Sequence, residues 1–212
     1  MILKDDGIAI VGAGGHAKVV ISAIVEAGMP VNAVFDDDEK KWGKEILGIP
    51  VIGPLELIGQ KKIKKAVIAI GDNSARKNIA ERLNAYCEWI TVIHPHSYVH
   101  PSVKLGEGTV VFAGAVIQPE TEIGRHAIVN TGATVDHDCK IGDYVHIAPG
   151  VHMAGNVSIG EGTFLGIGSS VINNVTIGSW VIVGAGGVVI KDIPSYSKVA
   201  GVPVKSLKIT NS

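Results

Sequence analysis

His137 is the residue of this sequence best placed for acid–base chemistry. It stands between two carboxylates, Asp136 and Asp138, in the stretch Asn-Thr-Gly-Ala-Thr-Val-Asp-His-Asp-Cys at residues 130–139. Carboxylates beside an imidazole raise its pKa and can orient one ring nitrogen while the other takes a proton. We therefore expect His137 to act as a general base. The simpler alternative is a histidine held in a hydrogen-bond network at the surface.

A second group of residues with chemical potential lies near the N-terminus, where Gly12-x-Gly14-x-x-Ala17 follows a short apolar run. This pattern approximates the dinucleotide-binding fingerprint, in which backbone N–H groups at a helix N-terminus receive a phosphate. The segment before residue 93 is, at about 90 residues, too short for both halves of a full dinucleotide site. We expect it to hold a nucleotide as part of a substrate, with His16 as a ligand contact. Glycines that merely permit tight strand–helix packing are the alternative.

The Gly-rich loop must be positioned by a strand–loop–helix–strand unit. Asp36 and Asp37 follow the second strand of that unit, where an acid could accept a ribose or base hydrogen bond. Residues 40–57 are predicted to be more irregular, because glycines and prolines interrupt them. The predicted elements are strands at residues 7–11, Val31–Phe35, 66–70 and 90–93, and helices at residues 17–27 and 74–86.

The second half of the chain repeats every six residues. From Ile93 to Val189 every sixth residue is Ile, Val, Leu or Met, and an aliphatic–Gly pair recurs every 18 residues from Leu105-Gly106 to Ile177-Gly178. Neither a helix nor a simple sheet has this period. A prism with three flat sides does, because each block of six forms one short strand and one corner. The repeat therefore predicts a hexapeptide-repeat parallel β-helix over residues 93–194.

The repeat also decides which side chains point outward. His137 falls on the third position of its block and is expected to face away from the aliphatic interior, whereas Cys139 is expected to point inward as a core residue. Zinc is not expected. The γ-type carbonic anhydrases, which share this architecture, use two histidines five residues apart and a third about two coils earlier. Here the spacings from His137 to His146 and on to His152 are nine and six, and residue 101 is proline.

Composition excludes several other classes of function. The formal net charge is −1, so the composition does not indicate the basic surface that nucleic-acid-binding proteins have. No apolar run approaches the roughly 20 residues that span a membrane. The two cysteines, Cys87 and Cys139, fall in different predicted domains, which favours free thiols and a cytoplasmic location.

The repeat, residues 130–139 and Gly14-Gly15-His16 together resemble a family of acyltransferases. This family includes sialic acid O-acetyltransferases and bacterial nucleotide-sugar 4-amino N-acetyltransferases, among them the bacillosamine-pathway and GDP-perosamine enzymes. The resemblance extends to residues 69–73 and to the closing Gly201-Val202-Pro203. It implies an α/β Rossmann-like nucleotide-sugar-binding domain at residues 1–92 and a left-handed β-helix acetyltransferase domain at residues 93–212. It also implies acetyl-CoA as co-substrate and a homotrimer with active sites between neighbouring β-helices.

The resemblance assigns roles to individual residues. His137 matches the general base and Asp138 the acid that raises its basicity. That acid is Asp here where some members have Glu, so its reach to the imidazole is shorter. Val204 replaces an Ala that is common in the C-terminal motif. The acetyl-CoA channel is matched by His146, Ile167 and Ala185. Gly155 matches the position whose N–H meets the thioester oxygen, and Lys205 matches a contact to a CoA phosphate. The diphosphate loop is matched by Gly14, Gly15 and His16, and the nucleoside pocket by Asp36, Asp37 and Gly71.

The implied reaction is direct transfer of acetyl from acetyl-CoA to the 4-amino group of a nucleotide-linked amino sugar, in a pathway of polysaccharide or glycan synthesis. No acyl-enzyme is expected, because no Ser or Cys is expected beside His137. Two alternatives stay open: O-acetylation of sialic acid or another sugar hydroxyl, and a non-catalytic β-helix that binds sugars without acetyl-CoA.

Overall fold

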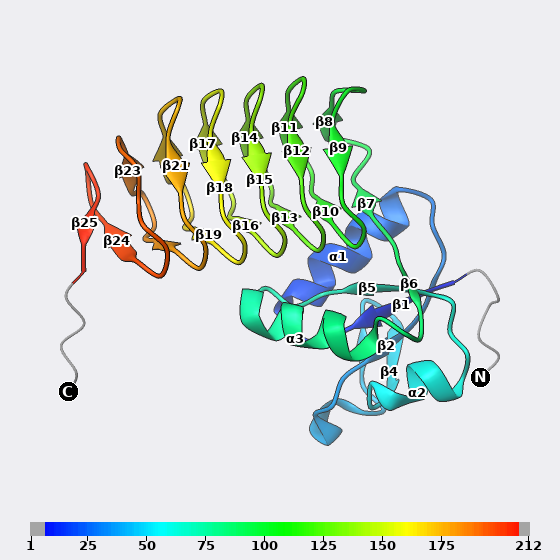
Figure 1. The fold of residues 1–212 in the computed structure, drawn as a ribbon. Helices are drawn as coiled ribbons and strands as arrows, with labels where there is room; N and C mark the ends of the chain where they lie inside the picture. The colour runs from blue at the N-terminus through cyan, green and yellow to red at the C-terminus, as the bar shows by residue number, and fades with distance from the viewer. Residues whose placement is uncertain (1–6, 208–212) are drawn as a thin grey trace.

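The computed structural model describes residues 7–207 and contains two domains that lie side by side (Figure 1). The N-terminal α/β domain is built on a six-stranded sheet with the order β3-β4-β2-β1-β5-β6. Strands β4, β2, β1, β5 and β6 are parallel, so their carboxyl ends meet along one edge of the sheet. The strands are β1 (Ile8–Val11), β2 (Val31–Phe35), β3 (Glu45–Ile46), β4 (Ile49–Gly53), β5 (Lys65–Ile68) and β6 (Glu88–Trp89).

Three α-helices and one 3-10 helix connect these strands: α1 (Gly15–Glu26), η1 (Glu39–Lys41), α2 (Glu56–Gln60) and α3 (Asn73–Leu83). The buried face of α1 carries Ala17, Val20, Ile21, Ala23 and Ile24, which recur at helical spacing. Asp72 caps α3 by accepting a hydrogen bond from Ala75 N at 2.8 Å. No helix within residues 7–207 is long and apolar enough to span a bilayer.

Residues 40–57 are more regular than predicted. They contain an antiparallel hairpin of β3 and β4, and β4 then pairs with β2. The hairpin turns at Leu47 and Gly48, both of which have positive φ. Pro50 lies within β4, where it faces the short strand β3. The strand predicted at residues 90–93 is shorter than expected, because β6 ends at Trp89 and β7 covers only Val92–Ile93.

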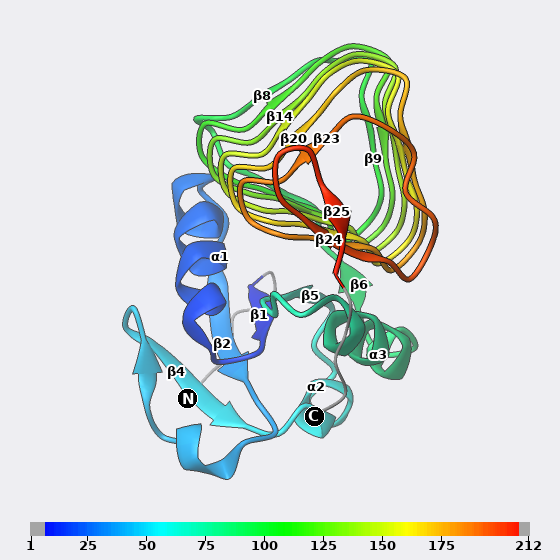
Figure 2. The ribbon, with the colours of Figure 1, turned by 90° about the vertical axis from the view of Figure 1, so that its left-hand side faces the viewer.

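The second domain is a left-handed parallel β-helix whose strands stack into three faces (Figure 2). Most strands pair in parallel with the strand 18 residues later, as Val110 does with Ile128. At the C-terminal end Ile182 pairs with Lys198 instead, and Lys205–Ser206 pairs antiparallel with Lys198–Ala200. The docked face, which carries the α/β domain, contains β7 (Val92–Ile93), β10 (Val110–Val111), β13 (Ile128–Val129), β16 (His146–Ile147), β19 (Phe164–Leu165), β22 (Ile182–Val183), β24 (Lys198–Ala200) and β25 (Lys205–Ser206).

The other two faces carry no part of the α/β domain (Figure 2). The open face contains β8 (Tyr98–Val99), β11 (Val116–Ile117), β14 (Thr134–Val135), β17 (His152–Met153), β20 (Ser170–Val171) and β23 (Val188–Val189). The charged face contains β9 (Lys104–Leu105), β12 (Glu122–Ile123), β15 (Lys140–Ile141), β18 (Ser158–Ile159) and β21 (Thr176–Ile177).

The interior of the prism is the aliphatic column that the repeat predicts. From Val111 onward the first residue of each block is at most 5% exposed, whereas Ile93, in the first coil, is 41% exposed. The corners require left-handed backbone at the fourth position of many blocks, as at Asp138 (φ 60°) and Asn156 (φ 57°). The hexad therefore fixes both the packed interior and the outward-facing corners.

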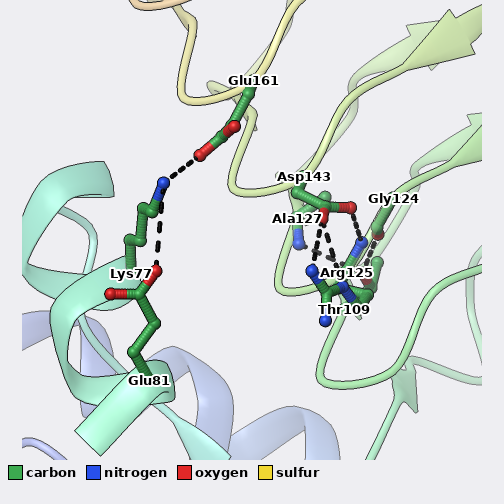
Figure 3. Close-up of polar contacts among 8 residues, drawn as sticks. All are labelled: Lys77, Glu81, Thr109, Gly124, Arg125, Ala127, Asp143 and Glu161. Atoms are coloured by element: carbon green, nitrogen blue, oxygen red, sulfur yellow. Dashed lines mark hydrogen bonds and ion pairs between the residues drawn. The ribbon is translucent and has the colours of Figure 1, made fainter.

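The α/β domain packs on the docked face through apolar side chains. Val110, Phe112 and Ile128 of the β-helix join one core cluster with residues of β1, β2 and α1. At the corner between the charged and docked faces, α3 adds polar contacts. Lys77 of α3 reaches Glu161 at 2.5 Å, and within the β-helix Arg125 pairs with Asp143 of the next coil at 2.9 Å (Figure 3). The two domains thus share a buried apolar seam, to which Lys77 adds a polar contact at one edge.

Candidate active site

His137 and Asp138 form a hydrogen-bonded pair on the corner between the open and charged faces. The distance from His137 Nδ1 to Asp138 Oδ2 is 2.7 Å, and both side chains are more than half exposed. The hydrogen bond to Asp138 raises the pKa of His137; desolvation opposes this effect, and the charges of Asp136 and Asp138 add to it. Because Nδ1 is engaged, Nε2 is left to accept a proton. The outward orientation predicted from the repeat is confirmed.

Gly155 lies directly against the imidazole, one coil after His137. A Cβ built on Gly155 would stand 2.6 Å from His137 Cε1 and 2.7 Å from Nε2, so the ring rests where any side chain at 155 would be. Within residues 7–207 we find no acceptor for the Gly155 N–H. A free N–H beside the base could donate to an oxyanion.

The remaining predicted acetyl-CoA contacts lie elsewhere on the β-helix. Ile167 and Ala185 stack in successive coils on the corner between the docked and open faces, where Gly186 N donates to Ile167 O at 2.8 Å. Ile167 is 61% exposed. Lys205, in β25, lines a pocket of about 330 Å³ at the C-terminal end of the prism together with Lys191.

The predicted diphosphate loop leads from β1 into the N-terminus of α1. Gly14 and Gly15 face open space, because a Cβ on either would meet no atom within 4 Å. Gly14 precedes the helix without a side-chain cap. The first N–H groups of α1 therefore point to an uncovered surface, as an anion-binding helix terminus requires.

The two predicted nucleoside contacts are both engaged inside the domain. Asp36 Oδ2 accepts from Ala13 N at 2.6 Å and from Lys41 Nζ at 3.0 Å. Burial raises the pKa of Asp36, but hydrogen bonds from Asp38 N, Ala13 N and Lys41 outweigh it and leave the pKa below its usual value. Asp37 accepts from Leu55 N at 3.0 Å and from Arg82 at 2.7 Å. Asp36 thus also braces the Gly-rich loop.

His16, His146 and Gly71 meet at the seam. The His146 ring is 8% exposed, its Nδ1 lies 3.2 Å from Gly71 O, and its Nε2 lies 3.2 Å from Asn130 Nδ2. The imidazole of His16 stands edge-on to Phe112 with centroids 5.5 Å apart and 6.2 Å from the centroid of His146. Burial, reinforced by the charge of Arg76, lowers the pKa of each histidine to about 4, so both are neutral near pH 7. His146 therefore lies beside Gly71 and the predicted diphosphate loop of its own chain.

The structure thus brings together two groups of the predicted residues on different sides of one chain, while Ile167, Ala185 and Lys205 lie outside both groups. His137, Asp138 and Gly155 are on the corner opposite the docked face, whereas the Gly-rich loop, Gly71 and His146 are at the seam. Within residues 7–207 no group of three or more His, Cys, Asp or Glu side chains could hold a metal.

Comparison with known proteins identifies the chain. Residues 7–83 match the PglD N-terminal domain and residues 120–155 match the bacterial transferase hexapeptide repeat. PerB from Caulobacter crescentus, solved with CoA and GDP-perosamine, is 42% identical with a TM-score of 0.93; the match covers 98% of this chain and all of that one. The chain belongs to the nucleotide-amino-sugar N-acetyltransferase family.

Two further relatives support this assignment. The acetyltransferase domain of PglB from Neisseria gonorrhoeae, solved with acetyl coenzyme A, is 39% identical and has a TM-score of 0.90. The match covers 96% of this chain and all of that one. UDP-N-acetylbacillosamine N-acetyltransferase of Bacillus subtilis is 45% identical over 110 residues, which are 50% of this chain and 51% of that enzyme. This alignment thus spans about half of that curated relative. The expected class, an acetyl-CoA-dependent N-acetyltransferase, is confirmed at the level of the family.

Sequence reasoning missed Arg76, Asn73 and Asn130, which hold the predicted site residues in place. Arg76 is 1% exposed and donates to carbonyls of both domains, and Asn73 donates to Gly162 O at 2.9 Å. The only sequence signal for Arg76 and Asn73 is a polar residue on the face of α3 that also carries Ala80 and Leu83. That signal does not distinguish a seam from a solvent-exposed face.

Proposed function

We propose that this protein transfers an acetyl group from acetyl-CoA to the 4-amino group of a nucleotide-linked amino sugar, with His137 as general base. The observation that carries the proposal is the 2.7 Å bond between His137 Nδ1 and Asp138, which leaves Nε2 free on an exposed corner. The relatives solved with GDP-perosamine and with acetyl coenzyme A support this pair of substrates.

In the proposed mechanism, the amine nitrogen attacks the thioester carbonyl as His137 Nε2 takes the amine proton. The N–H of Gly155 donates to the developing oxyanion, a contribution typically of about 3 kcal/mol for one donor. Collapse of the tetrahedral species breaks the carbon–sulfur bond, and the protonated His137 returns the proton to the thiolate. No residue needs to carry the acetyl group. The nearest thiol, Cys139, is buried and donates to His137 O at 3.6 Å.

We further propose that the two groups of site residues meet between subunits. The α/β domain (1–92) covers the docked face of its own β-helix (93–212), so it lies away from its own His137. A neighbouring copy can bring its Gly-rich loop to that corner instead. The acceptor sugar would then be held by one subunit and deprotonated by the next.

The open face is the surface that fits such a neighbour. Its outward side chains are uncharged: Tyr98, Val116, Thr134, His152, Ser170 and Val188. The charged face presents lysine and glutamate, including the pair Lys104–Glu122 at 2.6 Å. Exposed isoleucines flank the open face, with Ile167 at one corner and Ile172 and Ile190 at the other. Three copies joined through this face give a homotrimer with a cleft at each contact.

The nucleotide-binding loops at α1, together with Lys205, would hold the phosphates of the two substrates. Free thiols at Cys87 and Cys139 favour a cytoplasmic location, and the family favours a role in polysaccharide synthesis.

The proposal is tested by measuring free CoA release with acetyl-CoA and a panel of UDP-, GDP- and dTDP-linked 4-amino sugars. His137→Ala should lower kcat by at least about 10²-fold, the lower range for general-base catalysis, and leave the trimer mass unchanged. A turnover near that of the wild type would refute the assignment of His137. A pre-steady-state burst of CoA would refute direct transfer.

A further inference from the structure

Arg76 of α3 joins the two domains through every donor of its guanidinium group. It is 1% exposed. On the β-helix side its Nε donates to His126 O at 2.8 Å, and its Nη2 donates to Tyr144 O at 2.8 Å. These carbonyls are 18 residues apart, so Arg76 contacts two successive coils at the same corner.

On the other side Arg76 holds the loop between β5 and α3. Its Nη1 donates to Ile70 O at 3.1 Å and to Gly71 O at 3.2 Å, and its Nη2 also donates to Asn73 Oδ1 at 2.9 Å. The Nδ2 of Asn73 in turn donates to Gly162 O, on the next coil along. The loop that carries Gly71 is therefore fixed in register with three coils of the β-helix.

Arg76 forms no direct ion pair with a carboxylate among residues 7–207, although the charge of Asp72 acts on it; its five hydrogen-bond acceptors are four carbonyls and one amide oxygen. Burying an arginine in this way is costly, and an apolar side chain in the same space would leave these five acceptors without the hydrogen bonds that Arg76 donates. Only a planar fork with five N–H groups reaches all five acceptors at once. Its geometry, more than its contribution to packing, explains why an arginine is present.

Gly71 O is also the acceptor that lies 3.2 Å from His146 Nδ1. The loop held by Arg76 thus lies beside the Gly-rich loop, at the same edge of the sheet. We infer that Arg76 is a positioning residue: it fixes the Ile70–Gly71 loop on the β-helix so that the acceptor amine is aligned with the acetyl group. This inference rests on the proposed function.

The test compares Arg76→Lys with Arg76→Met. Lysine keeps the positive charge but loses the planar set of five N–H donors, and methionine is neutral and of similar length. Both should lower kcat at least about tenfold, because small misplacements of reacting groups are costly. The KM for acetyl-CoA should stay within about twofold, because its proposed contacts other than His146 make no hydrogen bond to Arg76. Asn73→Ala, which removes one acceptor and the link to Gly162, should act in the same direction by a smaller factor and guards against misfolding of the Arg76 variants.

Lys77→Ala serves as the matched control, since Lys77 is the next residue of α3 and makes an exposed ion pair with Glu161. It should keep both constants near wild type. A second measurement is the titration of the His146 imidazole by NMR. The pKa of His146, about 4, should rise when the charge of Arg76 is removed.

Arg76→Lys with a lowered melting temperature but wild-type kcat would overturn the inference and reduce Arg76 to a structural link. An unchanged His146 titration in Arg76→Met would also overturn it. Absence of transfer by the wild-type enzyme would refute the proposed function instead, and the His146 titration would still test whether Arg76 holds the seam.

Discussion

At the scale of single residues, the His137–Asp138 pair depends on an unusual backbone position. Asp138 has a φ of 60°, in the left-handed region that Asp and Asn tolerate better than longer side chains. Its short side chain still reaches Nδ1 at 2.7 Å, so the shorter reach expected for Asp does not prevent the bond. The corner geometry of the β-helix thus accommodates Asp138 as the partner of His137.

Asp138→Asn should separate the charge of this residue from its shape. Asn tolerates the same backbone, so the corner should stay intact. A general base must be unprotonated, and the hydrogen bond to Asp138 raises the pKa of His137. The acid limb of kcat/KM should therefore lie above the ordinary histidine value of about 6.5 in the wild type and move to lower pH in the variant. We expect kcat to fall at least about tenfold, because a weaker base accepts the proton less readily.

The measurement is kcat/KM across about pH 5 to 9. Asp136→Asn is the matched control, because Asp136 accepts from the His137 backbone N–H and affects the ring by charge alone. Asp136→Asn should shift the acid limb of kcat/KM to lower pH by less than Asp138→Asn does. An equal shift in both variants would contradict a special role for Asp138.

Gly155→Ala should displace the imidazole without straining the backbone. The added methyl would stand 2.6 Å from His137 Cε1, and Gly155 does not have a positive φ. The ring must swing away from its bond with Asp138, so we expect kcat to fall by about 10²-fold, as for loss of the base. A crystal structure should show the moved ring, and acetyl-CoA binding by calorimetry should persist. A variant with normal turnover would mean that the ring has another productive orientation.

At the scale of elements, we predict that the N-terminus of α1 serves ligand binding more than stability. Gly15→Ala should leave the melting temperature unchanged or slightly higher, because Ala favours helix by up to about 1 kcal/mol and meets no neighbour. The same methyl would narrow the space over the first N–H groups, so the KM for the nucleotide sugar should rise about tenfold.

Gly12→Ala provides the contrast. Gly12 has a φ of 104°, and its Cβ would stand 2.6 Å from Ile70 Cγ1, so this variant should lose stability. If Gly15→Ala instead lowers stability with an unchanged KM, the glycines serve packing alone, which is the alternative that the sequence left open.

The sequence predicts secondary-structure elements well where hydrophobic residues recur with a regular period. It predicts them poorly where contacts between residues distant in the chain determine the structure. The hexad locates the β-helix strands, and apolar runs locate β1 and β2, because these depend on local patterns. The hairpin of β3 and β4 escaped prediction, since Pro50 and Gly48 read as irregular turns and pairing with β2 is non-local. Arg76 escaped for the same reason, because its partners His126 and Tyr144 lie 50 and 68 residues away.

At the scale of the whole molecule, the fold places His137 and the Gly-rich loop on different sides of one chain, and only the proposed homotrimer would bring them together. The hexad predicts His137 as outward-facing, but only the docking of the α/β domain reveals which two of the three faces stay uncovered. A site shared between copies has a consequence that a site within one chain lacks. Two inactive variants can restore each other.

His137→Ala lacks the base but keeps the loop, and Gly15→Asp keeps the base but places a negative charge against the diphosphate. Each homotrimer should be nearly inactive. Mixed trimers formed by co-expressing both variants should recover about a third of wild-type activity, because one of the three contacts in each mixed trimer pairs an intact base with an intact loop. Activity is measured on tag-purified mixed trimers whose mass is three times 22.1 kDa. A site contained within one chain would give no recovery, because every chain in the mixture lacks one half of it.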